Sequence, residues 1–369
     1  MMDQKEEKRI FPPYRSMNLA ICSSVLDRYL DREDLKHSYE QYGLNGLEVI
    51  RTGEPDQGKI CPEMVTGVHL FFQVFWMDWW KGNTRWLDAE FDSRQQWIEY
   101  FGSENREGYL DRLRADLEYA DAVGAKYVVF HASEVDLLES FTWNYKYSDE
   151  EVVDACIEII NLLLDDRHYT FDFLVENLWW SGMTLKDAAL TRRMLEGIHY
   201  AHKGVMLDTG HFMNTNYELK TPGEALVYLH EMLDSHEKEG LLPYFKGMHL
   251  QLSLGGAYVR QQRKAWEQDR KIVCPSGECY SEQQFLKLPF YERFRLAYEH
   301  VGQIDRHQPF AAEGVARLVK RVSPVYLTFE FQQQSREEYE QFLCVQSRFL
   351  RCFCLEKEVP DYDSLIMAV

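Results

Sequence analysis

The sequence predicts a single (β/α)8 barrel, the TIM barrel fold, on three observations. Short runs of β-forming residues alternate with longer amphipathic stretches, a rhythm typical of a parallel sheet with helices outside it. Eight such runs occur, most of them followed by a helical pattern, which favours a closed barrel over an open sheet. Histidine and acidic residues recur at the ends of these runs, where the strands of a barrel converge.

The predicted strands are short and mostly apolar. They comprise residues 17–22, 47–50, 65–72, 127–131, 171–176, 204–208, 245–252 and 324–331. Amphipathic spacing predicts helices over residues 30–42, 109–123, 149–164, 184–195, 222–234 and 335–353. Local signals support two of these boundaries: Gly124 is typical of a helix end, and Thr221-Pro222-Gly223-Glu224 of a capped helix start.

Two long excursions interrupt the rhythm, one after the third run and one after the seventh. The first, residues 73–105, is crowded with tryptophan, and the second, residues 253–304, is polar and partly helical. Both should emerge at the catalytic end of the barrel. We therefore expect an N-terminal extension over residues 1–16, a barrel over residues 17–355 with an insertion at 253–304, and a C-terminal tail over residues 356–369.

Composition excludes several classes of protein. Of the 369 residues 45% are hydrophobic, enough for a large core, yet no apolar run approaches the ~18 residues of a membrane span. The charged N-terminus lacks the apolar stretch of a signal peptide, so we expect a cytoplasmic protein. A net charge of −19 repels polyanions and disfavours nucleic acid as a partner. The eight cysteines show no zinc-ribbon or redox spacing.

A core set of predicted metal ligands closes the last four strands. It comprises Glu176, Asp208, His249 and Glu330. A carboxylate at the end of an apolar strand must be paired, protonated or bound to a metal, because burying it bare is very costly. The only basic residue within these runs, Lys246, lies three residues from His249 and therefore faces the other side of the strand. These converging groups require a cation from outside the chain.

An outer set of candidate ligands lies nearby. It comprises His69, His131, His211, Asp305 and His307. Taken singly, a strand-end histidine is usually an ordinary core or surface residue and a strand-end acid is usually a helix cap. The joint pattern reverses this interpretation, because barrel strand ends share one axis. Mixed imidazole and carboxylate ligands suit zinc, manganese, iron or cobalt better than calcium, and one to three ions are expected.

The order of these ligands resembles the xylose-isomerase-like TIM-barrel superfamily, which includes endonuclease IV, tagatose-type epimerases, hydroxypyruvate isomerases and inosose dehydratases. Across strands five to eight the sequence reads Glu, Asp-x-x-His, His, Asp-x-His and Glu. The resemblance runs over residues 17–350.

The resemblance to endonuclease IV implies three metal ions. His69, His131 and Glu176 would hold the first ion. Glu176, Asp208, His249 and Glu330 would hold the second. His211, Asp305 and His307 would hold the third. In the isomerases and epimerases the set that holds the second ion binds a single ion, and its two glutamates also transfer protons.

The sequence departs from endonuclease IV in its substrate region. Leu70-Phe71-Phe72-Gln73 and the tryptophan-rich excursion stand where that enzyme has polar or small residues, and the stretch between His249 and Asp305 is longer. We therefore expect a small carbohydrate-like substrate. The predicted substrate contacts are Trp76, Trp143, Trp179 and Asn177.

Three functions follow in order. The sequence favours a sugar or polyol isomerase or epimerase of carbohydrate metabolism, in which one ion polarises a carbonyl while Glu176 and Glu330 move a proton. The alternative is a multinuclear metal phosphodiesterase similar to endonuclease IV. The third, a catalytically inactive barrel that serves as a binding module, is disfavoured by the complete ligand set. A homo-oligomer is compatible with each of them.

Overall fold

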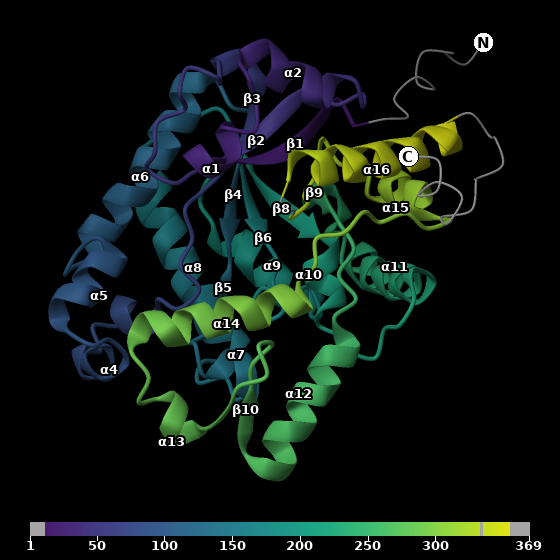
Figure 1. Ribbon diagram of the computed structural model, residues 1–369. Helices are drawn as coiled ribbons and strands as arrows, with labels where there is room; N and C mark the ends of the chain where they lie inside the picture. The colour runs from purple at the N-terminus through teal and green to yellow at the C-terminus, as the bar shows by residue number, and fades with distance from the viewer. Residues whose placement is uncertain (1–11, 333–334, 355–369) are drawn as a thin grey trace, which may run out of the picture.

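The computed structural model describes residues 12–332 and 335–354 and contains the predicted closed barrel (Figure 1). Eight parallel strands pair in chain order, and the last returns to pair with the first. They are β1 (Tyr14–Ile21), β2 (Gly46–Arg51), β3 (Val65–His69), β4 (Tyr127–His131), β6 (Asp172–Glu176), β8 (Lys203–Asp208), β9 (Phe245–Leu250) and β12 (Tyr326–Phe329). Because all are parallel, their carboxyl ends meet at one end of the barrel.

Helices surround the barrel in the predicted alternation. They are α1 (Ser23–Leu26), α2 (Arg32–Glu40), α6 (Arg106–Val123), α8 (Asp149–Leu164), α9 (Ala188–Gly197), α10 (Thr209–Met213), α11 (Pro222–Lys238), α15 (Val315–Val322) and α16 (Arg336–Cys354). α11 begins with a capping box in which Thr221 and Glu224 each bond the other's backbone N–H. α6 ends at Gly124, whose φ of 69° is left-handed, a conformation that glycine adopts without strain. Short 3-10 turns at Pro62–Met64 and Leu242–Tyr244 lead into β3 and β9.

Several boundaries differ from the sequence prediction. β1 begins at Tyr14, where the chain already pairs with Tyr326, three residues before the predicted start of the first strand at residue 17. β3 ends at His69 instead of residue 72, because the next turn bonds to other partners: the Phe71 N–H donates to the Asp116 carboxylate. The predicted tail over residues 356–369 lies outside the described residues. Among the helices described, none is long and apolar enough to cross a membrane.

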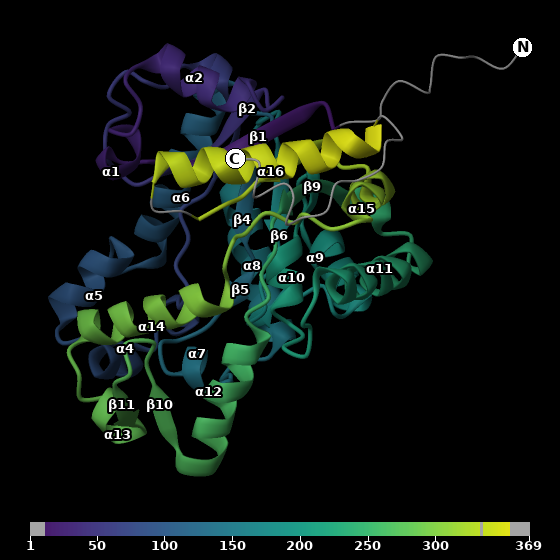
Figure 2. The ribbon, with the colours of Figure 1, turned by 45° about the vertical axis from the view of Figure 1, so that its right-hand side comes forward.

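The two excursions pack against each other at the carboxyl end of the barrel. The first contains α3 (Met77–Trp80), α4 (Thr84–Glu90) and α5 (Arg94–Phe101), and the second contains α12 (Gly256–Asp269), β10 (Lys271–Val273), β11 (Cys279–Ser281), α13 (Glu282–Phe285) and α14 (Phe290–Ile304). Figure 2 shows α14 beside α4 and α5. The Phe290 ring lies 4.2 Å from the Phe91 ring and 5.6 Å from the Tyr100 ring, measured between centroids.

Shorter elements complete this end of the barrel. The segment after β4 contains the two-residue strand β5 (Ser133–Glu134) and α7 (Glu139–Thr142), and β5 pairs with β7 (Ser181–Gly182) from the segment after β6. The segments after β4 and β6, together with α14, surround the carboxyl ends of the barrel strands.

A buried ion pair fixes α14 to the first excursion. Arg293 is 2% exposed, and its guanidinium donates to the Glu90 carboxylate at 2.6 Å. It also donates to the Leu288 carbonyl at 3.1 Å. Since neither charge reaches bulk water, each depends on the other for compensation.

We predict that Arg293→Met destabilises the protein by about 3–5 kcal/mol, because the change leaves the Glu90 carboxylate buried without its cation. Denaturant unfolding measures the effect. Arg295→Met is the matched control on the same helix. Its exposed pair with Glu299 should contribute less than about 1 kcal/mol. Equal stability of the two variants would contradict a structural role for the buried pair.

Candidate metal centre

Two histidines on neighbouring strands converge on one carboxylate oxygen. His69 from β3 and His131 from β4 place Nε2 atoms 3.3 Å and 3.2 Å from a single Glu176 carboxylate oxygen, Oε2. The other ring nitrogen of His69, Nδ1, lies 2.9 Å from the Leu70 carbonyl, which can only accept a hydrogen bond. Nδ1 therefore carries the proton in the neutral ring, and the Nε2 lone pair faces Glu176.

A second group is formed by the predicted core set. His249 Nδ1 lies 3.2 Å from Glu176 Oε1, 3.0 Å from Glu330 Oε2 and 3.8 Å from Asp208 Oδ2. Glu176, Asp208 and His249 are fully buried. Three carboxylate oxygens of this group, Glu176 Oε2, Asp208 Oδ2 and Glu330 Oε2, are buried and accept no hydrogen bond, although imidazole nitrogens lie close to them. Buried oxygens without donors indicate a place for a cation.

The third group depends on the loop after α14. An isolated bridge between Leu252 and Gln308 draws this loop against the end of β9. Within it, the Asp305 carboxylate lies 3.2 Å from His211 Nε2 and 2.6 Å from His307 Nε2. The predicted outer ligands of the third ion are thus brought together.

Burial and charge oppose each other in this cluster. Burial raises the pKa of Asp208 to about 8, and the carboxylates of Glu330 and Glu176 add to the effect. Burial also raises the pKa of Glu176, but His249 and His131 outweigh it and hold that pKa well below its ordinary value. The carboxylates in turn raise the pKa of His249 against the opposing effect of burial. The cluster therefore attracts positive charge, as protons on the histidines or as metal ions.

The donor set fits divalent metal ions. The candidate ligands form three groups, and within each group the ligand atoms lie within 4.8 Å of one another. The groups are His69, His131 and Glu176; Glu176, Asp208, His249 and Glu330; and His211, Asp305 and His307. Imidazole nitrogens and carboxylate oxygens in such numbers suit zinc, manganese, iron or cobalt. The unsatisfied oxygens of the central group are the structural observation that supports this fit.

Sequence reasoning missed Glu48 on β2. Its carboxylate is 2% exposed and accepts hydrogen bonds from the Tyr127 hydroxyl at 2.6 Å, the Thr328 hydroxyl at 2.8 Å and His249 Nε2 at 3.0 Å. The last contact fixes the His249 tautomer and leaves Nδ1 free to face the ligand cluster. An acid within the apolar run 47–50 was the available signal, since the burial argument used for the later strands applies there too.

Gln251 was also missed. Its side-chain amide is fully buried and donates to Asp208 at 3.1 Å and to Asp305 at 3.2 Å, so it joins the second and third groups. Gly210 allows this approach. A Cβ at that position would lie 2.0 Å from the Gln251 amide oxygen. Any larger residue there would displace Gln251.

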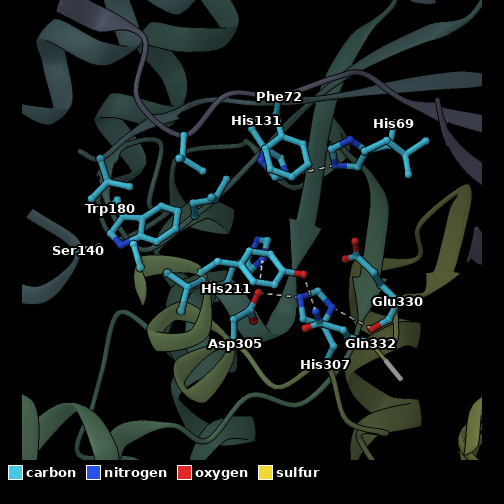
Figure 3. Close-up of a pocket in the computed structure, with 18 of the residues that line it drawn as sticks. His69, Phe72, His131, Ser140, Trp180, His211, Asp305, His307, Glu330 and Gln332 are labelled. Atoms are coloured by element: carbon cyan, nitrogen blue, oxygen red, sulfur yellow. Dashed lines mark hydrogen bonds and ion pairs between the residues drawn. The ribbon is translucent and has the colours of Figure 1, made fainter. Parts of the chain in front are cut away.

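A cavity of about 550 Å³ opens above the three groups (Figure 3). His69, His131, His211, Asp305, His307 and Glu330 contribute to its floor. Trp180 lies on one side, and the Phe72 ring lies 4.3 Å from the His131 ring between centroids. α14 provides a further part of the wall through residues such as Phe294 and Val301.

Of the four predicted substrate contacts, Trp179 lines this cavity, with its ring 5.3 Å from that of His211. The other three take other places. The Asn177 side-chain amide accepts from the Asp208 N–H at 2.9 Å and donates to the Asp208 carbonyl at 3.1 Å, so it orients the candidate metal ligand Asp208. The Trp76 indole N–H donates to the Ser133 carbonyl, deep in the packed loops. Trp143 packs beside His300, 6.1 Å away between centroids.

The family comparison agrees with the barrel. Residues 97–263 match the family model described as xylose isomerase-like TIM barrel. The match confirms the resemblance predicted from the ligand order. No curated protein sequence matches the chain.

Three solved structures with a similar fold come from proteins of different kinds. Endonuclease IV from Thermus thermophilus is 16% identical, with 92% of this chain and 99% of that chain covered and a TM-score of 0.45. A D-tagatose 3-epimerase-like protein is 10% identical, with 93% and 99% covered and a TM-score of 0.45. An IOLI protein with a binding zinc atom is 10% identical, with 93% and 97% covered and a TM-score of 0.47.

We predict that Glu176→Gln removes more metal than His307→Ala, because Glu176 belongs to two ligand groups and His307 to one. Metal content of the purified variants, measured by elemental mass spectrometry, checks this. The expected loss is about two equivalents against one. Full metal content in Glu176→Gln would contradict the assignment of the ligands.

We predict that Glu48→Gln weakens metal binding by about 10- to 100-fold, because His249 loses the carboxylate that orients its ring. Competition with a chromogenic chelator gives the affinity. Glu267→Gln, on the exposed side of α12, is the control and should bind as the wild type does. An unchanged affinity in Glu48→Gln would remove Glu48 from the metal centre.

Proposed function

We propose that this protein is a metal-dependent hydrolase that cleaves a phosphodiester bond in a small molecule. The completeness of three ligand groups around the shared Glu176 carries the proposal. Proton transfer on a sugar needs one ion and therefore only the group of Glu176, Asp208, His249 and Glu330. It gives no function to the other two ligand groups. Hydrolysis of a phosphoester can use several ions a few ångströms apart, because they stabilise both the attacking and the leaving oxygen.

The chain's own residues would hold and shape such a centre. When bound, the ions would supply Lewis acidity and a stronger nucleophile from water at neutral pH. Asn177 and Gln251 orient Asp208, while Glu48 orients His249. Second-layer hydrogen bonds of this kind keep ligands in place and tune their basicity.

The exposure of the two central glutamates supports hydrolysis over isomerisation. An isomerase of this type would use Glu176 and Glu330 to move a proton on the substrate. Glu330 lines the cavity, and its side chain is 14% exposed. Glu176 is fully buried beneath its histidines and is not among the lining residues. A proton on the substrate is therefore within reach of Glu330 but not of Glu176.

The second excursion supports a small substrate over duplex DNA. α14 lines the cavity, and its Tyr298 hydroxyl accepts a hydrogen bond from the Gln332 amide at 3.3 Å. A cavity of about 550 Å³ is typical of sites for small molecules. The net charge of −19 also repels a long polyanion.

We predict that the protein loaded with zinc or manganese hydrolyses bis(4-nitrophenyl) phosphate. Chelation by EDTA should abolish turnover, and Glu330→Gln should reduce it by at least 100-fold, since that change removes a ligand that faces the cavity. Release of 4-nitrophenolate measures the rate. DNA with an abasic site should remain uncut.

The opposite outcome is equally specific. Incorporation of solvent deuterium next to the carbonyl of a ketohexose, with no phosphodiester turnover, would replace the hydrolase with an isomerase. Rapid incision of abasic DNA would overturn the assignment to a small substrate.

A further inference from the structure

The cavity combines a polar floor with an apolar wall. The floor consists of the candidate metal ligands. The wall is contributed by Phe72, Leu137, Leu178, Trp180, Phe294 and Val301, which come from four separate segments of the chain. Such a division is typical of sites that hold a reacting polar group at one end of a ligand and an apolar body at the other.

Three polar side chains of the wall, those of Asn18, Ser140 and Asp136, already have partners within the protein. Asn18 accepts from the Phe331 N–H at 3.1 Å and from the Tyr339 hydroxyl at 2.7 Å. The Ser140 hydroxyl donates to the Leu137 carbonyl at 2.8 Å. Asp136 accepts from the Glu139 N–H at 2.7 Å. The hydroxyl groups of a sugar or polyol would lose water in this cavity without full replacement, which is unfavourable.

The charges of the lining residues also disfavour a charged group on the body of the ligand. Among the described residues that line the cavity, none is a lysine or an arginine, whereas Asp136 stands in the wall. A second anionic group on the ligand, away from the floor, would meet no cation there. The body of the ligand should therefore be uncharged.

We infer that the substrate carries a flat, uncharged, apolar group such as an aryl ring, which lies against the wall between α14 and the segments after β4 and β6. The position of the reacting phosphoester at the floor rests on the proposed function. The apolar group rests on the wall alone. Phe294 is the central contact, because its half-buried ring projects from α14 into the cavity beside Tyr100, 6.2 Å away between ring centroids.

Calorimetry with two uncharged probes tests the inference without any hydrolysis. We expect 2-naphthol to bind the metal-loaded protein at least 10-fold more tightly than myo-inositol. Phe294→Ala should weaken 2-naphthol binding by about 10-fold. Tyr291→Ala is the control on the same helix, since Tyr291 is 59% exposed and does not line the cavity; it should bind as the wild type does. Inositol binding as tight as that of naphthol would overturn the inference.

A second variant guards against an unfolded Phe294→Ala protein. Gly302 lines the cavity, and a Cβ there would meet no atom within 4 Å, so the side chain of Gly302→Trp begins in open space at the cavity. It should weaken 2-naphthol binding at least 5-fold while the metal content stays unchanged. Unaltered naphthol binding in both folded variants would place the aryl site elsewhere and refute the inference.

The two proposals fail separately. If 2-naphthol binds as expected but no phosphodiester is cleaved, the hydrolase assignment is wrong and the aryl site stands. If phosphodiesters are cleaved but 2-naphthol binds no better than inositol, the hydrolase stands and the aryl site is wrong.

Discussion

The buried carboxylate of Glu176 is the interaction on which the site depends. Imidazole nitrogens of four histidines lie within 3.3 Å of its two oxygens: His69, His131, His211 and His249. These histidines come from three strands and one helix. A fully buried carboxylate has no access to water, so its stability rests on the positive charge that these neighbours carry or help to bind. The barrel makes this arrangement feasible because parallel strands end at a common rim.

A layer of neutral and acidic side chains holds the ligands in place. Glu48 supports His249, and Asn177 and Gln251 support Asp208. Each of these supporting side chains is buried and forms at least one hydrogen bond with a ligand or its backbone. Because these hydrogen bonds already hold the ligands in place, little free energy is needed to order the ligands when a metal binds.

The long excursions convert a barrel rim into an enclosed site. Aromatic residues of the first excursion pack against α14 of the second, and the Arg293–Glu90 pair fixes the contact. The same packing supplies apolar wall to the cavity. Stability and substrate choice are therefore linked in this region, because residues on one helix contribute to both.

The sequence by itself determined the barrel and the order of its ligands. Strand periodicity and the position of a polar residue at a strand end are local properties, so Glu176, Asp208, His249 and Glu330 could be chosen as candidates without coordinates. The distribution of the nine candidates into three groups came from a family resemblance, and the geometry reproduces the same grouping.

Only the tertiary structure decided which polar side chains support the ligands and which residues meet the substrate. Asn177 follows Glu176 directly, yet its amide turns to the backbone of Asp208 on the next strand. Glu48 lies 201 residues before His249, and their contact exists only because the barrel closes. Trp76 and Trp143 look like cavity residues in the sequence but pack within the loops. Hydrogen-bond partners and side-chain directions in long excursions depend on contacts between distant segments, which no local pattern records.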